Sequence, residues 1–252
     1  MDKLNVVSIP VSTGSYADFI NNMVITAGKK KSEYACVANV HMLVEAHKNR
    51  RFAQVIEEAG YVTPDGKPIS WAIRLLYGIK QERVAGMTLL PDLLKAAEDA
   101  GLPVFFYGGT EEMLQKTAAH VNQRFPALTV AGTHSPPFRN LTALEEKKVA
   151  EKINASGAAL VFAILGCPKQ EKWMASMKGR VNAVMVGVGG ALPVMIGEQK
   201  RAPLWMQKAG LEWFFRMMQE PGRLFKRYAI TNSIFVYLLM KAYLQKKLLR
   251  PA

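Results

Sequence analysis

Polar residues and glycines follow four of the short apolar runs in this sequence, at points where parallel strands would end. Asn39 ends the run at residues 34–39, and His41 follows two residues later. In an open α/β sheet ligands bind beyond the carboxyl ends of the strands, so these residues are expected to converge on one site. Glycines there let backbone N–H groups approach a phosphate, and a threonine can cap a helix whose N-terminus favours an anion. The other candidate ligand-binding residues in these turns are Gly108, Gly109, Thr110, Gly166, Lys169, Gln170, Gly187, Gly189 and Gly190.

An acidic residue lies in a rigid turn at Pro64-Asp65-Gly66, after another short apolar run. A carboxylate fixed at the edge of a sheet could act as a general base and take a proton from an acceptor hydroxyl. Partial burial would raise its pKa toward the working pH. A purely structural turn aspartate is the alternative. His41 is a second candidate base, for which a packing role is the alternative.

Three common nucleotide-binding signatures are missing from the sequence. The first strand-to-helix turn, at residues 9–19, lacks the G-x-G-x-x-G pattern, no G-x-x-x-x-G-K-[ST] loop occurs, and there is no Asp-x-Asp pair. Their absence argues against a dinucleotide-dependent enzyme, a P-loop NTPase and a transferase that binds a metal through paired aspartates. A diphosphate leaving group would then be stabilised by backbone N–H groups and by Lys or Arg, with no cofactor and no metal site.

The elements that position these residues follow from the hydrophobic pattern. Strands separated by helices indicate βαβ units, so the sequence predicts an α/β fold with a Rossmann-like, mostly parallel sheet and helices on both faces. The runs at 104–107 and 159–165 are apolar throughout, as strands buried on both sides should be. The predicted strands are 4–9, 34–39, 104–107, 128–132, 159–165 and 183–186, and the predicted helices are 16–27, 41–58, 89–100, 111–125, 143–155 and 169–177.

The C-terminal fifth of the chain has a different composition. The net charge of +13 requires an anionic partner, and residues 198–252 hold eleven Lys or Arg, Arg250 among them, against three Glu. After Pro193 the pattern predicts no strand and two or three helices, broken near Pro203 and Pro221. Tryptophan and phenylalanine alternate with the basic residues, which is typical of a membrane interface. We therefore expect a catalytic core at 1–197 and a helical, basic, membrane-associating appendage at 198–252. A helical cap over the core is the alternative, and nucleic-acid binding is not expected because no recognition motif accompanies the charge.

The remaining features bound the cellular setting. Cys36 and Cys167 lack metal-ligand spacing and are expected to be buried, reduced thiols. The N-terminus lacks the features of a signal peptide, and no stretch reaches the ~20 apolar residues of a spanning helix. We expect a cytoplasmic protein that is soluble or peripheral on the inner face of the cell membrane.

Seven segments resemble the WecG/TagA/CpsF glycosyltransferase family, and the resemblance covers nearly the whole chain. The most specific are PKQEKWM within the fifth segment and the long C-terminal pattern. The segments are ANVHMLVEA (38–46), VTPDGKP (62–68), ERVAGMTLL (82–90), VFFYGGTEE (104–112), LGCPKQEKWM (165–174), GVGGALP (187–193) and RAPLWMQKAGLEWFFRMMQEPGRLFKRY (201–228).

The resemblance implies metal-independent, inverting transfer from a UDP-sugar to a polyprenyl-pyrophosphate-linked saccharide. It makes Asp65 the base, places Arg83 and Gln170 at the site, and implies an appendage that closes over the site and binds the anionic membrane surface. A homo-oligomer is compatible with it. The arginines that it assigns to neutralising the diphosphate are Arg216, Arg223 and Arg227.

The expected donor sugar is glucose. Family members that make teichoic acid and transfer N-acetylmannosamine commonly have Thr where this chain has Val37, and Phe-Asp where it has Leu192-Pro193. The ANVHMLVEA variant is similar to GumM-like exopolysaccharide glucosyltransferases, which form a β-1,4 linkage from UDP-glucose to glucosyl-pyrophosphoryl-polyprenol. Transfer of N-acetylmannosamine, or its uronic acid, in teichoic-acid or enterobacterial-antigen synthesis is the alternative. An alternative of another class is a non-catalytic nucleotide- or lipid-binding module.

Overall fold

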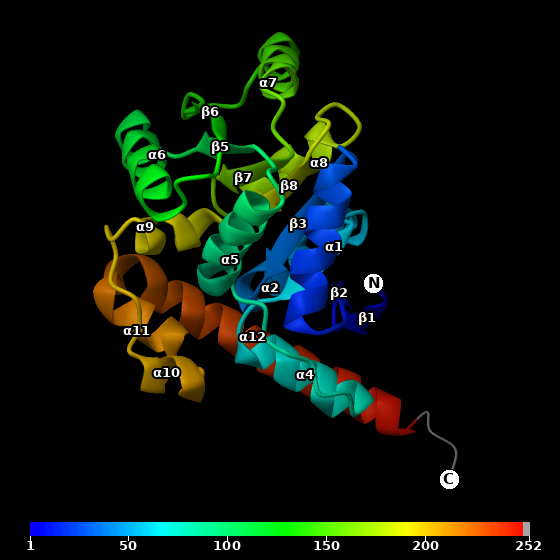
Figure 1. The fold of residues 1–252 in the computed structure, drawn as a ribbon. Helices are drawn as coiled ribbons and strands as arrows, with labels where there is room; N and C mark the ends of the chain where they lie inside the picture. Colours follow the sequence, from blue (N-terminus) through cyan, green and yellow to red (C-terminus); the bar gives the residue numbers. More distant parts are fainter. Residues whose placement is uncertain (249–252) are drawn as a thin grey trace.

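A six-stranded, fully parallel sheet forms the centre of the molecule in a computed structural model that describes residues 1–248 (Figure 1). Arg250 and the other three terminal residues of the predicted appendage lie outside the described part. The strand order β4-β3-β8-β7-β5-β6, with helices on both faces, confirms the predicted α/β class. The strands are β3 (Glu33–Ala38), β4 (Tyr61–Pro64), β5 (Val104–Gly108), β6 (Val130–His134), β7 (Leu160–Ile164) and β8 (Val184–Gly187).

Alternate residues of each strand pack into two separate cores. In β3, Tyr34 and Cys36 face one core, whereas Ala35 and Val37 face the other. Such two-sided burial explains why the central strands are apolar at every position. One core is covered by α1 (Tyr16–Gly28), α5 (Gly86–Asp99), α6 (Glu111–Arg124) and α9 (Leu192–Met195), and the other by α2 (Val40–Lys48), α3 (Arg50–Glu57), α4 (Lys67–Tyr77), α7 (Ala143–Ala155) and α8 (Lys169–Met177).

Two predicted elements differ from the observed ones, and other observed elements were not predicted. The strand predicted at 4–9 is two strands, β1 (Lys3–Val6) and β2 (Ile9–Ser12), which form an antiparallel hairpin outside the main sheet because Val7, at φ 60°, turns the chain. The helix predicted at 41–58 is divided into α2 and α3 at Asn49, whose side chain caps α3 by accepting from the Phe52 amide at 3.2 Å. Strand β4 and helix α4 were not predicted at all.

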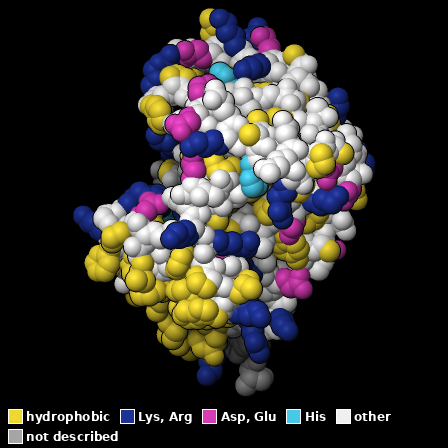
Figure 2. All heavy atoms as spheres, turned by 60° about the vertical axis from the view of Figure 1, so that its left-hand side comes forward, with side chains coloured by type: hydrophobic (Ala, Val, Ile, Leu, Met, Phe, Trp, Pro, Cys, Tyr) yellow, Lys and Arg dark blue, Asp and Glu magenta, His cyan; other side chains and the backbone are white. Residues whose placement is uncertain are grey.

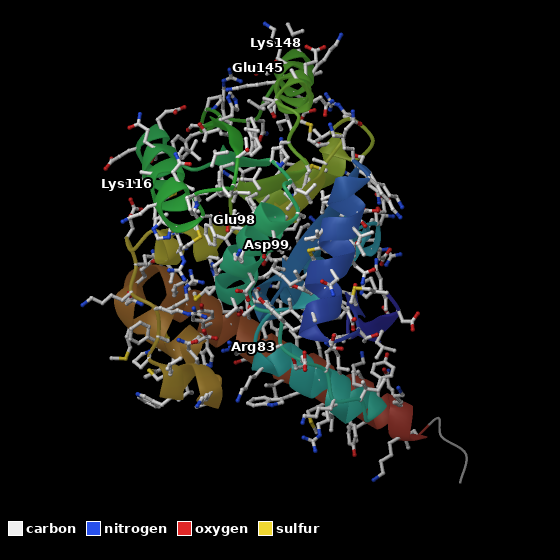
Figure 3. All side chains as sticks on the ribbon, in the orientation of Figure 1. Arg83, Glu98, Asp99, Lys116, Glu145 and Lys148 are labelled. Carbon is white, nitrogen blue, oxygen red and sulfur yellow. The ribbon has the colours of Figure 1, made fainter. Side chains whose placement is uncertain are left out.

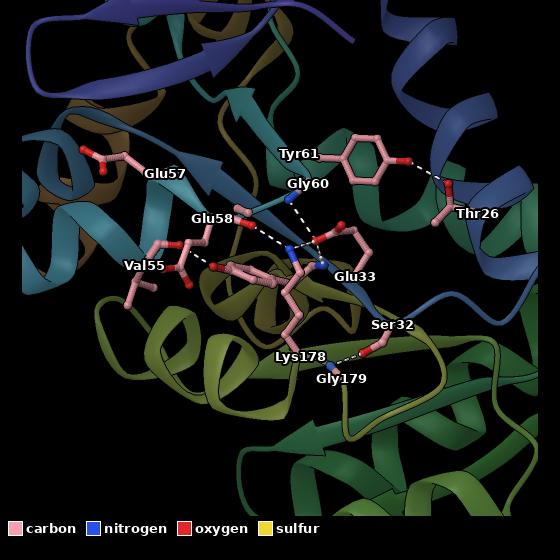
Figure 4. A network of polar contacts seen from close by, with 12 residues as sticks. Thr26, Ser32, Glu33, Val55, Glu57, Glu58, Gly60, Tyr61, Lys178 and Gly179 are labelled. Carbon is pink, nitrogen blue, oxygen red and sulfur yellow. Dashed lines mark hydrogen bonds and ion pairs between the residues drawn. The ribbon is translucent and has the colours of Figure 1, made fainter.

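A polar network joins the amino-terminal ends of β3 and β4, at the end of the sheet away from the candidate site (Figure 4). Glu33 accepts from the Gly60 amide at 3.0 Å and pairs with Lys178 at 2.8 Å. The Gly179 amide donates to Ser32 Oγ at 2.7 Å. A Cβ on Gly60 would lie 2.4 Å from the Glu33 side chain, so this glycine is needed for the close contact. We assign this network to the stability of the fold.

The C-terminal region is helical, as predicted. It contains α10 (Leu204–Ala209), α11 (Glu212–Gln219) and α12 (Pro221–Leu248), with breaks near Pro203 and Pro221. The long helix α12 packs against α2 and α4, and its C-terminal half lies beside α4 along the lower side of the molecule (Figure 1). Among residues 1–248, none of the helices has the combination of length and apolar composition that a membrane span requires.

Candidate active site

A cavity of about 740 Å³ lies beyond the carboxyl ends of β3, β4, β7 and β8, and is bounded on the other side by α11 and α12. It therefore lies where the core and the C-terminal helices meet. Twelve of the residues predicted at the site line it: Asn39, His41, Asp65, Arg83, Gly166, Gln170, Gly187, Gly189, Gly190, Arg216, Arg223 and Arg227.

Four predicted residues do not line this cavity. Gly108 ends β5, and Gly109 and Thr110 follow it. Strand β5 lies beyond β7 in the sheet, so this turn lies to the side of the cavity and none of the three residues lines it. Thr110 caps α6, accepting from the Met113 amide at 3.2 Å. The fourth residue, Lys169, is exposed at the start of α8. The structure thus gives no support to substrate binding in the cavity by these four residues.

Asp65 is positioned by the backbone at the end of β4. Its amide donates to the Ala38 carbonyl of the neighbouring strand at 2.8 Å. Asn39 follows Ala38 directly and caps α2. Its Oδ1 atom accepts from the Met42 amide at 3.1 Å. This cap leaves the Asn39 amide group as the donor toward the Asp65 carboxylate. The unpredicted strand β4 is therefore the element that brings the candidate base to the site.

Burial raises the pKa of Asp65 from its ordinary value of 3.8 to about 6. The charges of Arg83 and Arg216 oppose this rise, whereas the charge of Glu212 adds to it. A carboxylate with a pKa near 6 is mostly ionised at pH 7 and is a stronger base than an exposed aspartate. The environment of Asp65 therefore suits proton abstraction from a hydroxyl.

Arg83 and Glu212 form an ion pair that joins the core to α11. Both side chains are largely buried, with exposed fractions of 20% and 14%. Figure 3 shows Arg83 between α4 and α5, near the ribbon of α12. The second Glu212 oxygen, Oε1, is buried at the cavity without a hydrogen-bond partner in the described residues. This ion pair is therefore part of the site as well as a link between the two regions.

Cationic side chains from α11 and α12 form the wall of the cavity opposite the sheet. Arg223 pairs with Glu220. Within residues 1–248, neither Arg216 nor Arg227 has a carboxylate at ion-pairing distance. Arg216 approaches Gly190 so closely that a Cβ there would lie 2.7 Å from its guanidinium. The cavity thus carries an excess of positive charge suited to a diphosphate.

The glycines after β8 provide space for a glutamine side chain. A Cβ on Gly187 or Gly189 would lie 2.9 Å from the side chain of Gln170. Gln170 is buried and accepts from the Gly166 amide at 3.2 Å, while its amide donates to the buried Glu171 carboxylate at 2.7 Å. These glycines were predicted to bring backbone N–H groups near a phosphate. The structure shows a further reason for glycine at these positions, because a larger residue would collide with the buried Gln170 side chain.

His41 lines the cavity with its Nδ1 atom buried and without a partner among the described residues. Burial lowers the pKa of His41, and the positive charge of Arg227 lowers it further. A neutral imidazole at pH 7 can donate one hydrogen bond and accept another. A lowered pKa also makes His41 a weaker base than an exposed histidine, so its position suits substrate binding, and its role as a second base stays a prediction.

Several residues that line the cavity have no separate signal in the sequence. Glu212 and Tyr228 are contributed by α11 and α12, and Trp71 by the unpredicted helix α4. Glu212 and Tyr228 stand inside the C-terminal segment already used for the family resemblance, so the segment was recognised although these roles were not. In the described residues, no group of three or more His, Cys, Asp or Glu side chains is arranged to hold a metal ion. Metal independence itself stays a prediction.

Comparison with known proteins identifies one family of glycosyltransferases. The model of the glycosyl transferase WecG/TagA/CpsF family matches residues 4–248. A protein of Bacillus spizizenii is 32% identical over 196 residues, which cover 77% of this chain and 74% of the relative. Proteins of Bacillus subtilis and Staphylococcus aureus are 28% and 29% identical over 210 residues, covering 83% of this chain and 79% and 80% of the relatives. All three are named N-acetylglucosaminyldiphosphoundecaprenol N-acetyl-beta-D-mannosaminyltransferase.

Proposed function

Since the chain belongs to the WecG/TagA/CpsF family of glycosyltransferases, we propose that it transfers N-acetylmannosamine from a UDP-sugar to an N-acetylglucosaminyl-diphosphoryl-polyprenol. The names of the relatives support this alternative better than the glucose transfer expected from the sequence motifs. The observation that carries the proposal is the juxtaposition, in one cavity, of an aspartate with a raised pKa and an excess of arginines.

The proposed chemistry is a single displacement. Asp65 accepts the proton of the acceptor hydroxyl as its oxygen attacks the anomeric carbon of the donor. The bond from that carbon to the diphosphate oxygen breaks, and UDP leaves with the electron pair. Attack on the face opposite UDP inverts the anomeric configuration. The pKa of about 6 makes Asp65 suitable for this step, because it is ionised at pH 7 yet still has appreciable basicity.

Neutralisation of the developing diphosphate charge is the second requirement. Arg216 and Arg227 supply unneutralised guanidinium groups at the cavity, and Arg223 supplies a third that is shared with Glu220. Guanidinium groups bind phosphate oxygens with paired hydrogen bonds, which are stronger in a partly dry site. We infer that this wall holds a diphosphate, either of the donor or of the acceptor.

Glucose transfer is the second candidate, and two cavity residues favour it. Val37 and Pro193 both line the cavity, at the positions where the sequence departs from the teichoic-acid pattern. An apolar residue cannot replace the hydrogen bonds that Thr and Asp would give to a sugar. The apolar residues at these two positions therefore favour a donor other than that of the relatives.

We further propose that the C-terminal helices bind an anionic membrane surface from the cytoplasmic side, so that residues 198–252 act as a membrane-associating appendage on a core of 1–197. Figure 2 shows hydrophobic side chains gathered at the lower end of the molecule, with basic side chains beside them. Large exposed apolar residues beside Lys and Arg suit the headgroup region of a bilayer. The absence of nucleic-acid binding and a homo-oligomeric state stay predictions. The exposed apolar residues of α10, α11 and the start of α12 are Leu204, Trp205, Trp213, Phe214, Met218 and Phe225.

A donor screen tests the proposed reaction. The purified protein is incubated with N-acetylglucosaminyl- or glucosyl-diphosphoryl lipid and with UDP-N-acetylmannosamine or UDP-glucose, and UDP release and the mass of the lipid are followed. We expect an N-acetylhexosamine-sized gain on the first lipid. A hexose-sized gain on the glucosyl lipid would instead support glucose transfer, and UDP binding without turnover in any combination would contradict both.

A further inference from the structure

The cavity changes in character along helix α12. Near the start of the helix the lining residues are Arg223 and Arg227, and further along they are Phe235, Val236 and Leu239. With Asn232, which also lines the cavity, these positions are spaced at one to five residues, so they lie along one side of the helix. From Arg227 to Leu239 the helix rises about 18 Å. One side of the cavity therefore runs from cationic to apolar over a length much greater than that of a diphosphate.

Two other helices complete the apolar end. Helix α4 contributes Trp71, and the start of α2 contributes Val40 and Met42. Trp71 is 57% exposed although it lines the cavity, and Val236 on the facing helix is equally exposed. Large, exposed apolar side chains that line the same cavity are costly unless a ligand covers them.

We propose that this apolar end, between α4 and α12, binds the first isoprene units of the polyprenyl chain of the acceptor. The inference rests on the proposed function, because that function supplies an acceptor with a diphosphate joined to a prenyl chain. A prenyl diphosphate has the same order of charge and hydrophobicity as the α12 face, with an anionic group followed by an apolar chain. Arg223 and Arg227 bind the diphosphate, and Trp71 and Val236 contact the chain beside it. The groove thus positions the acceptor sugar toward Asp65.

The groove is distinct from the general apolar surface of the same helices. Leu75 on α4 and Tyr237 and Leu244 on α12 are also exposed, but they do not line the cavity. A membrane surface would contact all exposed apolar residues on the side that faces it, whereas the groove involves only the residues that line the cavity. Leu244, which is 53% exposed, is therefore a matched control for Val236, which is 57% exposed.

The test uses water-soluble acceptors of increasing length without a membrane. Each acceptor carries N-acetylglucosaminyl diphosphate on a methyl group, one isoprene unit, a geranyl chain or a farnesyl chain. We expect kcat/KM of the unaltered protein to rise about tenfold with each of the first units and then to level off. Every buried CH₂ contributes a factor of about four, so tenfold corresponds to burial equivalent to between one and two CH₂ groups of each unit, as in a half-open groove. Trp71→Ser and Val236→Ser should each lower the ratio of farnesyl to methyl activity by about tenfold, and Leu244→Ser should not. An unchanged ratio in the first two variants, or an equal loss in the third, would overturn the groove.

A binding measurement separates failure of the groove from failure of the proposed reaction. Titration calorimetry compares farnesyl diphosphate with inorganic diphosphate, neither of which carries a sugar. We expect farnesyl diphosphate to bind at least tenfold more tightly, and Trp71→Ser to remove most of that advantage. If no sugar is transferred while this advantage persists, the groove stands and the reaction is wrong. If sugar is transferred but chain length changes neither binding nor kcat/KM, the reaction stands and the groove is wrong.

Discussion

The ion pair between Arg83 and Glu212 should set the pH at which the enzyme loses activity in acid. The positive charge of Arg83 lowers the pKa of Asp65, and the negative charge of Glu212 raises it. If Asp65 is the base, kcat/KM is retained above its pKa of about 6 and falls as the pH decreases through that value. This fall of kcat/KM at low pH is the acid limb of the pH profile. Neutralising either member of the ion pair should therefore move the acid limb, and the two substitutions should move it in opposite directions.

The size of the effect follows from Coulomb's law. A unit charge at about twice the salt-bridge distance, with an effective dielectric constant near 20, contributes about 2 kcal/mol. One pKa unit corresponds to about 1.4 kcal/mol, so a shift of about one and a half pH units is expected in each variant. Glu212→Gln removes a negative charge and also releases Arg83 to act on Asp65, so the acid limb of this variant moves to lower pH. Arg83→Gln removes a positive charge and leaves Glu212 unpaired, so the acid limb of this variant moves to higher pH.

The assay is UDP release at subsaturating acceptor, measured across the pH range in which each variant remains folded. Arg83 could also contact substrate, which would lower the plateau, but the midpoint of the limb is independent of the plateau. Arg139→Gln is the matched control, because Arg139 pairs with Glu145 at 2.5 Å near α7. Figure 3 shows Glu145 at the opposite end of the molecule from Arg83. A shift of both limbs in the same direction, or an acid limb that persists in Asp65→Asn, would refute the assignment of the base.

Three further predictions concern stability and membrane binding. Asp65→Asn should abolish turnover yet stabilise the fold by about 1–3 kcal/mol at pH 7, because a raised carboxyl pKa costs stability above pH 6 and not below about pH 4; thermal unfolding at both pH values tests this. Gly108→Ala should destabilise by about 2–3 kcal/mol in urea unfolding, since Gly108 has a φ of 106° and a Cβ would lie 2.7 Å from the Ile164 carbonyl oxygen; a stable variant would contradict this. The paired change Trp205→Ser and Phe225→Ser should lower sedimentation with anionic vesicles at least tenfold, whereas Phe138→Ser, on the loop before α7, should not; equal losses would argue against an appendage-specific surface.

The hydrophobic pattern predicted the fold well where elements are long or buried on both faces. Strands β5 and β7 and helices α6 and α7 lie within a few residues of their predicted bounds. Strand β4 has four residues and ends in Pro64, so its pattern is too short to distinguish it from a loop. Its partner in the sheet, β3, supplies the hydrogen bonds that make it a strand, and this pairing depends on tertiary structure.

The candidate site was predicted in its residue types but only partly in its geometry. Placing polar residues at strand ends correctly identified Asn39 and Gln170 as cavity residues, because every parallel strand presents its carboxyl end at the same edge. The same reasoning included Thr110, because the order of strands in the sheet cannot be obtained from chain order. The pairing of Arg83 with Glu212 could not be predicted either, because the two residues are far apart in sequence and meet only through the docking of α11.

Burial is the largest cause of the raised pKa of Asp65, and the C-terminal helices form one wall of the cavity in which Asp65 lies. Glu212, Arg216 and Tyr228 all line the cavity in which the carboxylate lies. Without these helices water would enter the cavity, and the pKa of Asp65 would fall toward its ordinary value. Under the proposed function the C-terminal helices have two chemical effects, since they would supply the cations for a diphosphate and make the aspartate a stronger base. If the same helices also bind the membrane, a fully basic Asp65 arises only where the C-terminal region is docked, which is where a lipid-linked acceptor is held.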